Sequence, residues 1–475
     1  MKNKFNAKKL MRQVVHNGES KFFLTEANEI YMSYGPHPQK GAFLMLATNL
    51  DPIIISAAKM PLSSAQKEAV RQLIIDEGHK LALAQQVSTR IGAKGDNLYV
   101  DLGNNGTAKV TAKGVTIQKE SPVPYFKSKT LSSLPEPDLS ADIPIRHGLK
   151  LLKKLINVTN AQFMLVVAWL MSLFLLKGEK PILILEGGQG SAKTTTMKNL
   201  TKILDPHQPP HVSLSTREKD IFITAHNRAL VGFDNVSDIR ANVSDWLCQI
   251  SSGGATASRK LYTDGEEFII YAHSSIILNG ITTNAVRGDL LDRAIKIETP
   301  VLGPEARQTG TELDAKFQEH HPIILGALLR MAQYGLKNPR TLPDELKGSR
   351  LADFCQWTYS WAPAAEVSPE ALLEKIVENQ RRAKLEVLSE DTVTAIMLEL
   401  LEDNDDNWAG SSTRLFEEFR RVAQGRMIKL SNLPDSPRAL TAWLVRSEPS
   451  LAASGIEISR KHSNRGTLYT ISRNR

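Results

Sequence analysis

Short apolar runs alternate with longer stretches of helical character between residues 148 and 336. The clearest of these runs are PILILE (181–186), RALVGFD (228–234) and SSIILN (274–279). Apolar runs of this length predict buried strands, and helical stretches between them predict parallel strands in one sheet. The pattern therefore predicts an α/β core in this part of the chain.

Residues 163–176, FMLVVAWLMSLFLL, form the most apolar run. Its fourteen residues fall short of the roughly 20 that a helix needs to cross a bilayer. We therefore predict a buried helix in a soluble, cytoplasmic protein with no membrane partner, and re-entrant membrane contact is the alternative. Residues 97–127 instead alternate apolar and polar positions around Asn105-Gly106, which predicts antiparallel strands.

The segment 406–475 predicts two helices followed by a hairpin. Ser411 and Ser436 stand where helix N-caps are expected, and Pro437 then occupies the first helical position. Residues 455–472 predict two strands around a basic tip. Helix, helix and basic hairpin, in this order, predict a winged-helix-like domain.

These patterns divide the chain into five segments. The predicted segments are an N-terminal α+β accessory domain (1–130), a Ser/Pro-rich linker (131–147), the α/β core (148–336), a helical region (337–405) and the winged-helix-like domain (406–475).

The composition is that of an ordinary globular chain, with 475 residues of which 41% are hydrophobic and 23% charged. This usage excludes wholesale disorder. The formal net charge of +8 permits a polyanionic partner without requiring one. Two cysteines exclude a disulfide framework and, by themselves, a zinc site. We expect His320 and His321 to lie at the surface.

The segment 181–204 carries the clearest chemical motif, because a predicted buried strand leads into a Gly-rich loop and then a helix. The loop reads Gly187-Gly188-Gln189-Gly190-Ser191-Ala192-Lys193-Thr194. It departs from the phosphate-loop (P-loop) pattern G-x-x-x-x-G-K-[ST] only at Ala192, and alanine is acceptable there if its backbone is already helical.

This motif predicts binding of ATP and Mg²⁺. Small residues let backbone N–H groups surround a phosphate at the start of a helix. Lys193 reaches the β- and γ-phosphates, and the hydroxyl of Thr194, or of Thr195 or Thr196 in a shifted register, binds Mg²⁺. A glycine-rich turn with an incidental Lys-Thr pair is the alternative.

Polar side chains end the other two predicted strands. Asp234 stands where such a protein needs an acid to hold Mg²⁺. Asn235 follows where many ATPases carry a glutamate, and an amide cannot accept the proton of the attacking water. Either Asn235 orients that water, Asp238 or Glu186 replaces the base, or hydrolysis is slow. Asn279 is a candidate for positioning the water, although Asn-Gly is also a common turn.

The motifs follow one another in an order that resembles a known family. After the loop and Asp234-Asn235 come GGATASRKLYTD (253–264), ILNG (277–280) and RGDLLDRAI (287–295). This set resembles AAA+ ATPases of the superfamily-three helicase type, and more narrowly the primase/helicase-like proteins of phages and other bacterial mobile elements. The resemblance covers most of the chain from about residue 90 onward, and it implies an AAA+ P-loop core in a ring oligomer.

The resemblance also implies a contact with single-stranded DNA. Residues 253–272 match a hairpin that faces the central channel of a hexamer, and Arg259, Lys260 and Tyr262 would there contact the DNA strand. A solvated strand turn is the alternative.

An arginine finger is the second implied role. Arg293, with Arg287 as the competing candidate, matches an arginine that completes the ATP site of a neighbouring subunit. An ion pair with Asp289 or Asp292 is the alternative for both.

Positive charge is concentrated at the C-terminal end, where residues 446–475 hold six Arg or Lys and two Glu. In a winged-helix-like domain, Lys461 and Arg465 at the hairpin tip would reach DNA phosphates. Arg438 would start the helix that reads base edges. These residues predict binding of origin or duplex DNA, with a protein-interaction domain as the alternative.

Together, these features predict an ATP-dependent DNA helicase or translocase that replicates a phage or other bacterial mobile element as a homo-hexamer. Its expected partners are single-stranded DNA, origin DNA and separate primase or host replication proteins. The alternative is an ATP-switched initiator or helicase loader with little or no unwinding activity, which Asn235 favours. A small-molecule kinase is a third interpretation, which the hairpin segment and the terminal additions disfavour.

Overall fold

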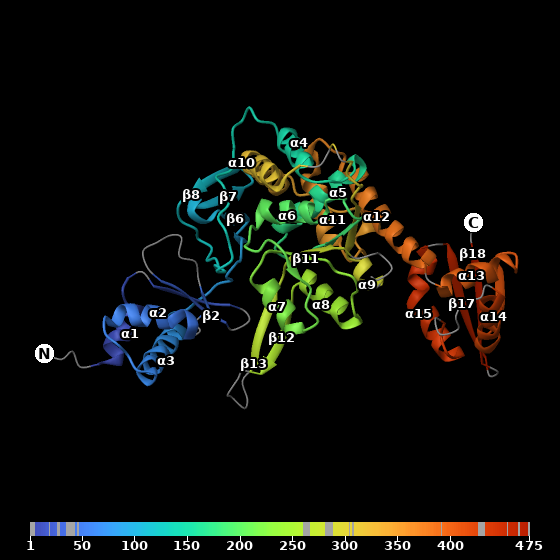
Figure 1. The fold of residues 1–475 in the computed structure, drawn as a ribbon, viewed down its shortest axis with the longest axis horizontal. Helices are drawn as coiled ribbons and strands as arrows, with labels where there is room; N and C mark the ends of the chain where they lie inside the picture. Colours follow the sequence, from blue (N-terminus) through green and yellow to red (C-terminus); the bar gives the residue numbers. More distant parts are fainter. Residues whose placement is uncertain are drawn as a thin grey trace.

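The fold is that of a computed structural model. It describes every residue except 1–4, 19, 26–28, 35–42, 45–46, 260–266, 281–287, 304, 306–307, 391, 426–432, 454, 464–465 and 474–475. We call residues 5–84 the N-terminal body, 85–390 the central body and 392–473 the C-terminal body. Figure 1 shows the two terminal bodies on opposite sides of the central body.

The N-terminal body packs helices against a small sheet in the order β3-β2-β1-β4. Alternate side chains of β1 and β2 face opposite ways, so Phe22 and Met32 pack with the helices while Phe23 and Tyr31 face Phe126. The Tyr31 hydroxyl lies 3.2 Å from His226 Nε2, which joins this body to the central one. The elements are α1 (Ala7–Val15), β1 (Lys21–Leu24), β2 (Ile30–Ser33), β3 (Phe43–Leu44), α2 (Ala47–Ala58), α3 (Ser64–Leu81) and β4 (Leu83–Ala84).

The central body begins with an antiparallel sheet in the order β5-β6-β7-β8. The predicted strands around Asn105-Gly106 are confirmed as β6 and β7, and β5 and β8 extend them on either side. The elements are β5 (Ile91–Lys94), β6 (Asn97–Asp101), η1 (Gly103–Asn105), β7 (Thr107–Thr111) and β8 (Gly114–Gln118).

A parallel sheet in the order β10-β11-β14-β9-β15 forms the centre of this body. The three predicted strands are confirmed as β9, β11 and β14, whereas β10 and β15 were not predicted. The elements are α4 (Ile145–Leu155), α5 (Asn160–Met171), η2 (Ser172–Phe174), β9 (Ile182–Glu186), α6 (Lys193–Leu204), β10 (Val212–Ser213), α7 (Glu218–His226), β11 (Leu230–Asp234), α8 (Ala241–Ser252), β14 (Ser275–Asn279), α9 (Gly288–Leu291) and β15 (Ala294–Glu298).

A two-stranded hairpin leaves the parallel sheet before β14. Strands β12 (Gly254–Arg259) and β13 (Glu267–Ala272) pair antiparallel, and the hairpin projects from the central body (Figure 1). Helices complete this body and lead out of it. They are α10 (Gly310–Lys337), η5 (Asp344–Leu346), α11 (Ala352–Trp361), η6 (Ala362–Ala365) and α12 (Pro369–Glu390).

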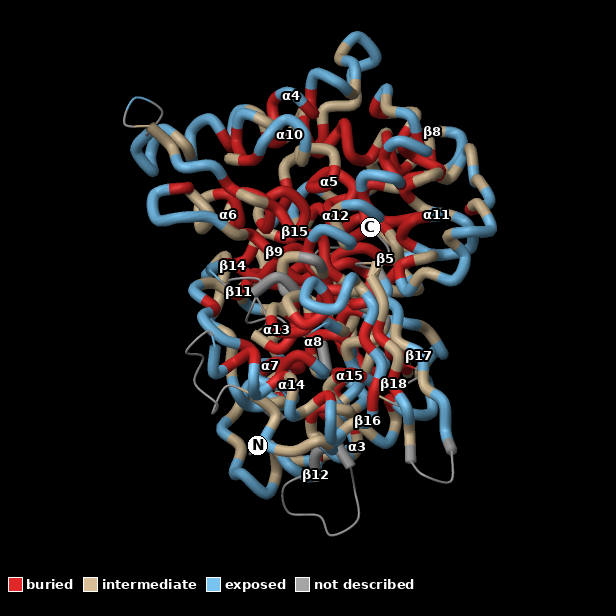
Figure 2. Tube along the Cα trace, turned by 90° about the vertical axis from the view of Figure 1, so that its right-hand side faces the viewer, coloured by how far each residue is buried: buried red, intermediate tan, exposed pale blue. Residues whose placement is uncertain are grey.

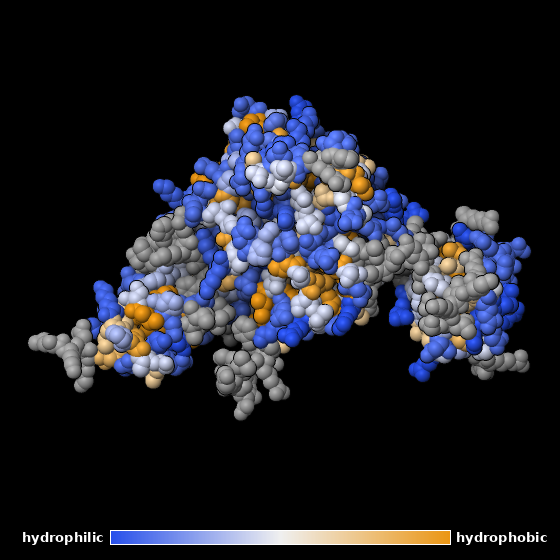
Figure 3. All heavy atoms as spheres, in the orientation of Figure 1, coloured by the Kyte–Doolittle hydropathy of each residue, from blue (hydrophilic) through white to orange (hydrophobic). Residues whose placement is uncertain are grey.

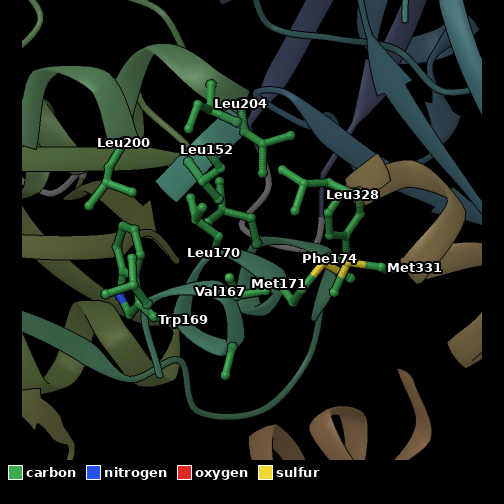
Figure 4. Packing of buried hydrophobic residues seen from close by; sticks show 14 of the residues in the cluster. Leu152, Val167, Trp169, Leu170, Met171, Phe174, Leu200, Leu204, Leu328 and Met331 are labelled. Atoms are coloured by element: carbon green, nitrogen blue, oxygen red, sulfur yellow. The ribbon is translucent and has the colours of Figure 1, made fainter. Parts of the chain in front are cut away.

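One hydrophobic core joins the antiparallel sheet to the helices that follow it. Val100 and Val110 belong to the same buried cluster as Trp169 and Leu328. Figure 4 shows Trp169, Leu170 and Leu328 packing among side chains from several helices, and Figure 2 shows the buried residues concentrated in this region. The predicted boundary at residue 130 therefore does not coincide with a gap in the packing.

The predicted linker, residues 131–147, also lies against the central body. Backbone N–H groups of Ser132, Leu134 and Asp138 donate to carbonyl oxygens of Pro206, Leu102 and Pro322 at 2.8, 3.2 and 2.9 Å. Its Ser/Pro composition is that of an irregular segment, but these hydrogen bonds hold it in place.

A buried ion pair ties the antiparallel sheet to the parallel one. Arg90 is fully buried and its Nε lies 3.2 Å from Asp205 Oδ1, while Asp205 Oδ2 accepts backbone N–H groups of Ala229 and Leu230. Burial raises the pKa of Asp205, but hydrogen bonds and charge from His207 and Arg90 outweigh that effect and leave it lowered.

The apolar run 163–176 forms α5 and η2 inside the core, as predicted. Within the described ranges, no helix by itself has the length and apolar character to cross a membrane. Helices α4 and α5 with η2 satisfy that test only as a pair bent by 108°.

His321 corrects one expectation. It lies on α10 with only 4% of its surface exposed, against the Phe317 ring, and its Nε2 donates to the Ile203 carbonyl oxygen at 2.8 Å. The surface position expected for it is therefore wrong, because the apolar face of α10 extends over this turn.

The C-terminal body has its own hydrophobic core. The predicted caps are confirmed, since Ser411 Oγ accepts from Arg414 N at 3.3 Å and Ser436 Oγ from Ala439 N at 3.2 Å. The predicted hairpin gains a third strand in the order β16-β18-β17. The elements are α13 (Thr392–Glu402), β16 (Asn407–Ser411), α14 (Ser412–Gly425), α15 (Pro437–Ala453), β17 (Ile456–Ser463) and β18 (Gly466–Arg473).

Candidate nucleotide site

The Gly-rich loop connects the carboxyl end of β9 to the start of α6. Gly187 to Gly190 are exposed, together with Gln189, whereas Ser191 is buried and donates to the Gly188 carbonyl oxygen at 2.9 Å. A Cβ atom at Gly187 would come within 2.4 Å of Thr299 Oγ1, so the first position of the loop has no space for a side chain. The loop therefore runs close to the backbone that follows β15.

Ala192 departs from the expectation that its backbone would be helical. It has φ 54° and ψ 30°, in the left-handed region, and it is the N-cap of α6. This is the conformation for which the motif's glycine is suited. The prediction accepted an alanine here only if its backbone were already helical, and it is not. Ala192 therefore carries backbone strain at the base of the loop.

Lys193, the first residue of α6, turns its side chain back over the loop. Its Nζ donates to the carbonyl oxygens of Gly187 at 2.5 Å and Gly188 at 2.9 Å. The ammonium group thus lies at the loop, next to the N-terminal end of a helix. Both features favour an anion at this position.

Three polar side chains from different elements converge beside Lys193. Thr194 Oγ1 lies 3.2 Å from Asp234 Oδ1 and 3.2 Å from Asn279 Nδ2, which also donates to the Asp234 carboxylate. The parallel pairing of β9, β14 and β11 explains this, because their carboxyl ends lie side by side. A hydroxyl and a carboxylate oxygen suit Mg²⁺. Thr195 lies on the same first turn of α6.

Asn279 Oδ1 is buried and, among the residues that the structure describes, has no hydrogen-bond partner. Buried polar oxygens are usually satisfied, so an unpaired one beside Asp234 marks a position for a further donor, such as water.

Side chains that the sequence did not single out brace the loop. Asn157 Nδ2 donates to the Ser191 carbonyl oxygen at 2.9 Å and to the Pro300 carbonyl oxygen at 2.6 Å. Thr299 Oγ1 lies 2.9 Å from Ser191 Oγ and donates to the Glu186 carbonyl oxygen at 2.8 Å. No local pattern marks these residues, because their role depends on the pairing of β15 with β9.

The two residues considered as a replacement base differ in their surroundings. Glu186 pairs with Lys296 on the β15 side of the sheet, whereas Asp238 is exposed beyond the end of β11 and lines the same cavity as Asp234. Asn235 has φ 56°, a left-handed conformation that asparagine tolerates, and its N–H donates to Asp234 Oδ1 at 3.0 Å. His211 Nδ1 lies 3.6 Å from Asp234 Oδ2; it precedes β10, a strand that the sequence pattern did not reveal.

A cavity of about 320 Å³ opens beside Asp234. Hydroxyl-bearing residues from the end of β10 and the turn after β11 make up much of its wall: Ser213, Ser215, Thr216 and Ser237. Asp234, Asn235 and Asp238 also line it, so open space lies next to the convergent polar group.

Arg293 makes its contacts within its own chain. Its side chain is 15% exposed, with Nε donating to Glu179 Oε1 and Nη1 donating to the Asp289 carbonyl oxygen at 3.1 Å. This geometry favours the ion-pair interpretation over an arginine finger, although the carboxylate involved is that of Glu179. Arg287 lies outside the described residues.

The residues expected to contact DNA belong to two separate parts of the chain. Arg259 ends β12, and Lys260 and Tyr262 lie outside the described residues, as does Arg465. Arg438 is exposed on the first turn of α15, and Lys461 is exposed on β17. Both elements belong to the C-terminal body (Figure 1). The hairpin and the C-terminal body therefore present separate groups of these positions.

These observations define a mixed α/β protein with a parallel sheet and a polar site at the carboxyl ends of its strands. Residues 149–369 match the family described as the actinomycete integrative conjugative element replication protein. Residues 393–475 match the C-terminal domain of that replication protein, RepA. The chain is thus similar to a mobile-element replication protein over both segments, with residues 1–148 and 370–392 outside the matches.

No curated protein matches the chain. Among solved structures, apo structures of the NrS-1 C-terminal region are similar, with 13% and 12% identity and a TM-score of 0.40. The alignments cover 98% and 99% of this chain and 99% and 100% of those chains. This degree of likeness supports no conclusion about function.

Proposed function

We propose that the chain is an ATP-dependent DNA helicase or translocase that acts in replication of an integrative conjugative element, as a ring-shaped oligomer. The observation that carries the proposal is the convergence of Lys193, Thr194, Asp234 and Asn279 at the carboxyl ends of three parallel strands. The similarity to a replication protein supports the DNA substrate.

Each convergent side chain has a separate task in this proposal. Lys193 binds the β- and γ-phosphates from above the loop, while the loop backbone and the start of α6 surround them. Thr194 and Asp234 hold Mg²⁺, which neutralises the charge that develops during phosphoryl transfer. Asn279 orients the attacking water beside the γ-phosphate.

The proposed DNA contacts use the two separate sites. The β12–β13 hairpin with Arg259, Lys260 and Tyr262 contacts a single strand, and its motion follows the nucleotide state of the sheet. The C-terminal body with Arg438, Lys461 and Arg465 binds duplex DNA and places the motor. Its surface is largely hydrophilic in the view of Figure 3.

The second candidate function is an ATP-switched initiator or helicase loader. The observation that favours it is the pairing of Glu186 with Lys296, which engages one of the two candidates for the base that Asn235 cannot supply. A protein that binds ATP without rapid hydrolysis changes state on binding and resets slowly.

ATP hydrolysis with and without single-stranded DNA separates these functions. We expect turnover that rises with DNA and is lost in Lys193→Ala, because the substitution removes the cation above the loop. Lys198→Ala, on the same helix but away from the loop, is the matched control and should keep its turnover.

Other outcomes point elsewhere. ATP binding without turnover, with or without DNA, would support the switch. If the unaltered protein bound no ATP, the loop would be a structural turn and both functions would fail.

A further inference from the structure

Helix α12 lies along the β15 edge of the parallel sheet. β15 is the edge strand, and an edge strand presents unpaired backbone groups. Asn379 on α12 satisfies both groups of one edge residue: Lys296 N–H donates to Asn379 Oδ1 at 2.9 Å, and Asn379 Nδ2 donates to the Lys296 carbonyl oxygen at 2.7 Å. The helix thus takes the place of a further strand.

Charged side chains extend the contact between α12 and β15 toward the nucleotide loop. Lys296 is 6% exposed and its Nζ lies 2.5 Å from Glu186 Oε2, while it also pairs with Glu386 on α12. Glu298 on β15 lies opposite Glu186 on β9, so the side chains of these two residues point to the same face of the sheet. Lys296 is two residues before Glu298 and points to that face as well, which brings it within reach of Glu186. Glu186 is the last residue before the Gly-rich loop.

The same helix leads directly to the C-terminal body. Leu372, Leu373 and Ile376 anchor its first half in the core of the central body. Its end at Glu390 is one residue from α13, whose Val393 and Ile396 belong to the core of the C-terminal body. Figure 1 shows α12 running from the central body toward the C-terminal body.

We propose that Lys296 is a positioning residue that transmits the nucleotide state of the loop through Glu186 and Glu386 to α12, and so to the duplex-binding C-terminal body. One buried ammonium group is shared by two carboxylates on different elements. A shift of Glu186 when the loop binds nucleotide changes how strongly Lys296 holds Glu386. This inference rests on the proposed function, because it requires both a nucleotide and duplex DNA.

The test measures duplex DNA affinity of the full chain with and without a non-hydrolysable ATP analogue. In the unaltered protein we expect the analogue to change the dissociation constant by about fivefold or more, the lower range of allosteric coupling. Glu386→Gln should bring that ratio close to one while leaving the affinity for the analogue within about twofold, because Lys296 keeps its pair with Glu186. Glu378→Gln, an exposed position on the same helix, is the matched control and should keep the full ratio.

Lys296→Met is a second variant, and it should also abolish the ratio. The substitution removes a buried charge that contacts Glu186 and Glu386, so the unfolding transition of this variant is measured first. If Lys296→Met does not fold, the result for Glu386→Gln tests the proposal alone. An unchanged ratio in folded Glu386→Gln overturns the proposal. Nucleotide binding without any effect on duplex affinity in the unaltered protein overturns it as well, while the proposed ATP site stands. Failure to bind the analogue overturns both.

Discussion

Ala192 holds a backbone conformation that an L-amino acid adopts at a cost. A left-handed φ places Cβ too close to the following carbonyl oxygen, which costs roughly 1–2 kcal/mol. The residue persists there because Ser191 and Thr299 brace the loop on one side and α6 begins on the other. Strain of this kind gathers at binding loops, where the surrounding structure over-determines the backbone.

Ala192→Gly is therefore expected to leave the free energy of unfolding unchanged or to raise it by up to about 1 kcal/mol. Glycine relieves the strain in the folded protein, and this gain offsets its greater conformational freedom in the unfolded chain. Ala315→Gly, at an exposed position inside α10, should lower it by about 1 kcal/mol. Chemical denaturation of both variants checks the difference. An equal loss in the two variants would contradict the left-handed conformation of Ala192.

Helix α10 illustrates how an element determines the chemistry of a side chain. Burial lowers the pKa of His321 to about 4, an effect to which the charges of Arg90 and Lys202 add, while the hydrogen bond to Ile203 opposes it. The ring is therefore neutral in the folded protein at pH 5–6, where the unfolded chain binds a proton. Its contribution to stability is complete above pH 6.5 and is lost as the pH falls toward 4.

A loss of about 3 kcal/mol between pH 6.5 and 4 follows from a shift of this size. In His321→Gln this part of the pH dependence should disappear, so the curve of unfolding free energy against pH becomes shallower by about 1.4 kcal/mol per unit. Denaturant titrations at several pH values measure the slope. An unchanged slope in His321→Gln would show that another group is responsible.

At the scale of the whole molecule, parts with separate hydrophobic cores present separate groups of basic residues. The C-terminal body has a core of its own, whereas the antiparallel sheet shares its core with the parallel-sheet region. The β12–β13 hairpin stands apart from the C-terminal body (Figure 1). Different substitutions should therefore weaken the binding of single-stranded DNA and the binding of duplex DNA.

Salt dependence of binding distinguishes the two sites. Each substitution should remove one phosphate contact and so reduce the slope of the logarithm of the binding constant against the logarithm of the salt concentration. We expect a reduction of about 0.7 for single-stranded DNA in Arg259→Ala, and of about 0.9 for duplex DNA in Lys461→Ala. Each variant should leave the other slope unchanged. Lys347→Ala, an exposed cation elsewhere, is the control. If both variants changed both slopes equally, the separation of the sites would be wrong.

Several features of the fold follow from the sequence alone. The strands β9, β11 and β14, the buried helix α5 and the caps at Ser411 and Ser436 depend on local patterns of apolar residues and on short-range hydrogen bonds. The same holds for the Gly-rich loop, whose residues are consecutive. Local sequence also places Asp234 and Asn279 at strand ends, which is why both could be singled out before their neighbours were known.

The order of the strands and the contacts between distant residues were decided only by the tertiary structure. β10 is two residues long and β15 contains a lysine and a glutamate, so neither shows the apolar run of a central strand. Asn157, Thr299 and Lys296 acquire roles because β15 pairs beside β9, and His211 because β10 pairs beside β11. Arg293 meets Glu179 across more than a hundred residues of chain. Hydrophobic periodicity determines which segments are buried, but only three-dimensional packing determines which polar groups meet once they are there.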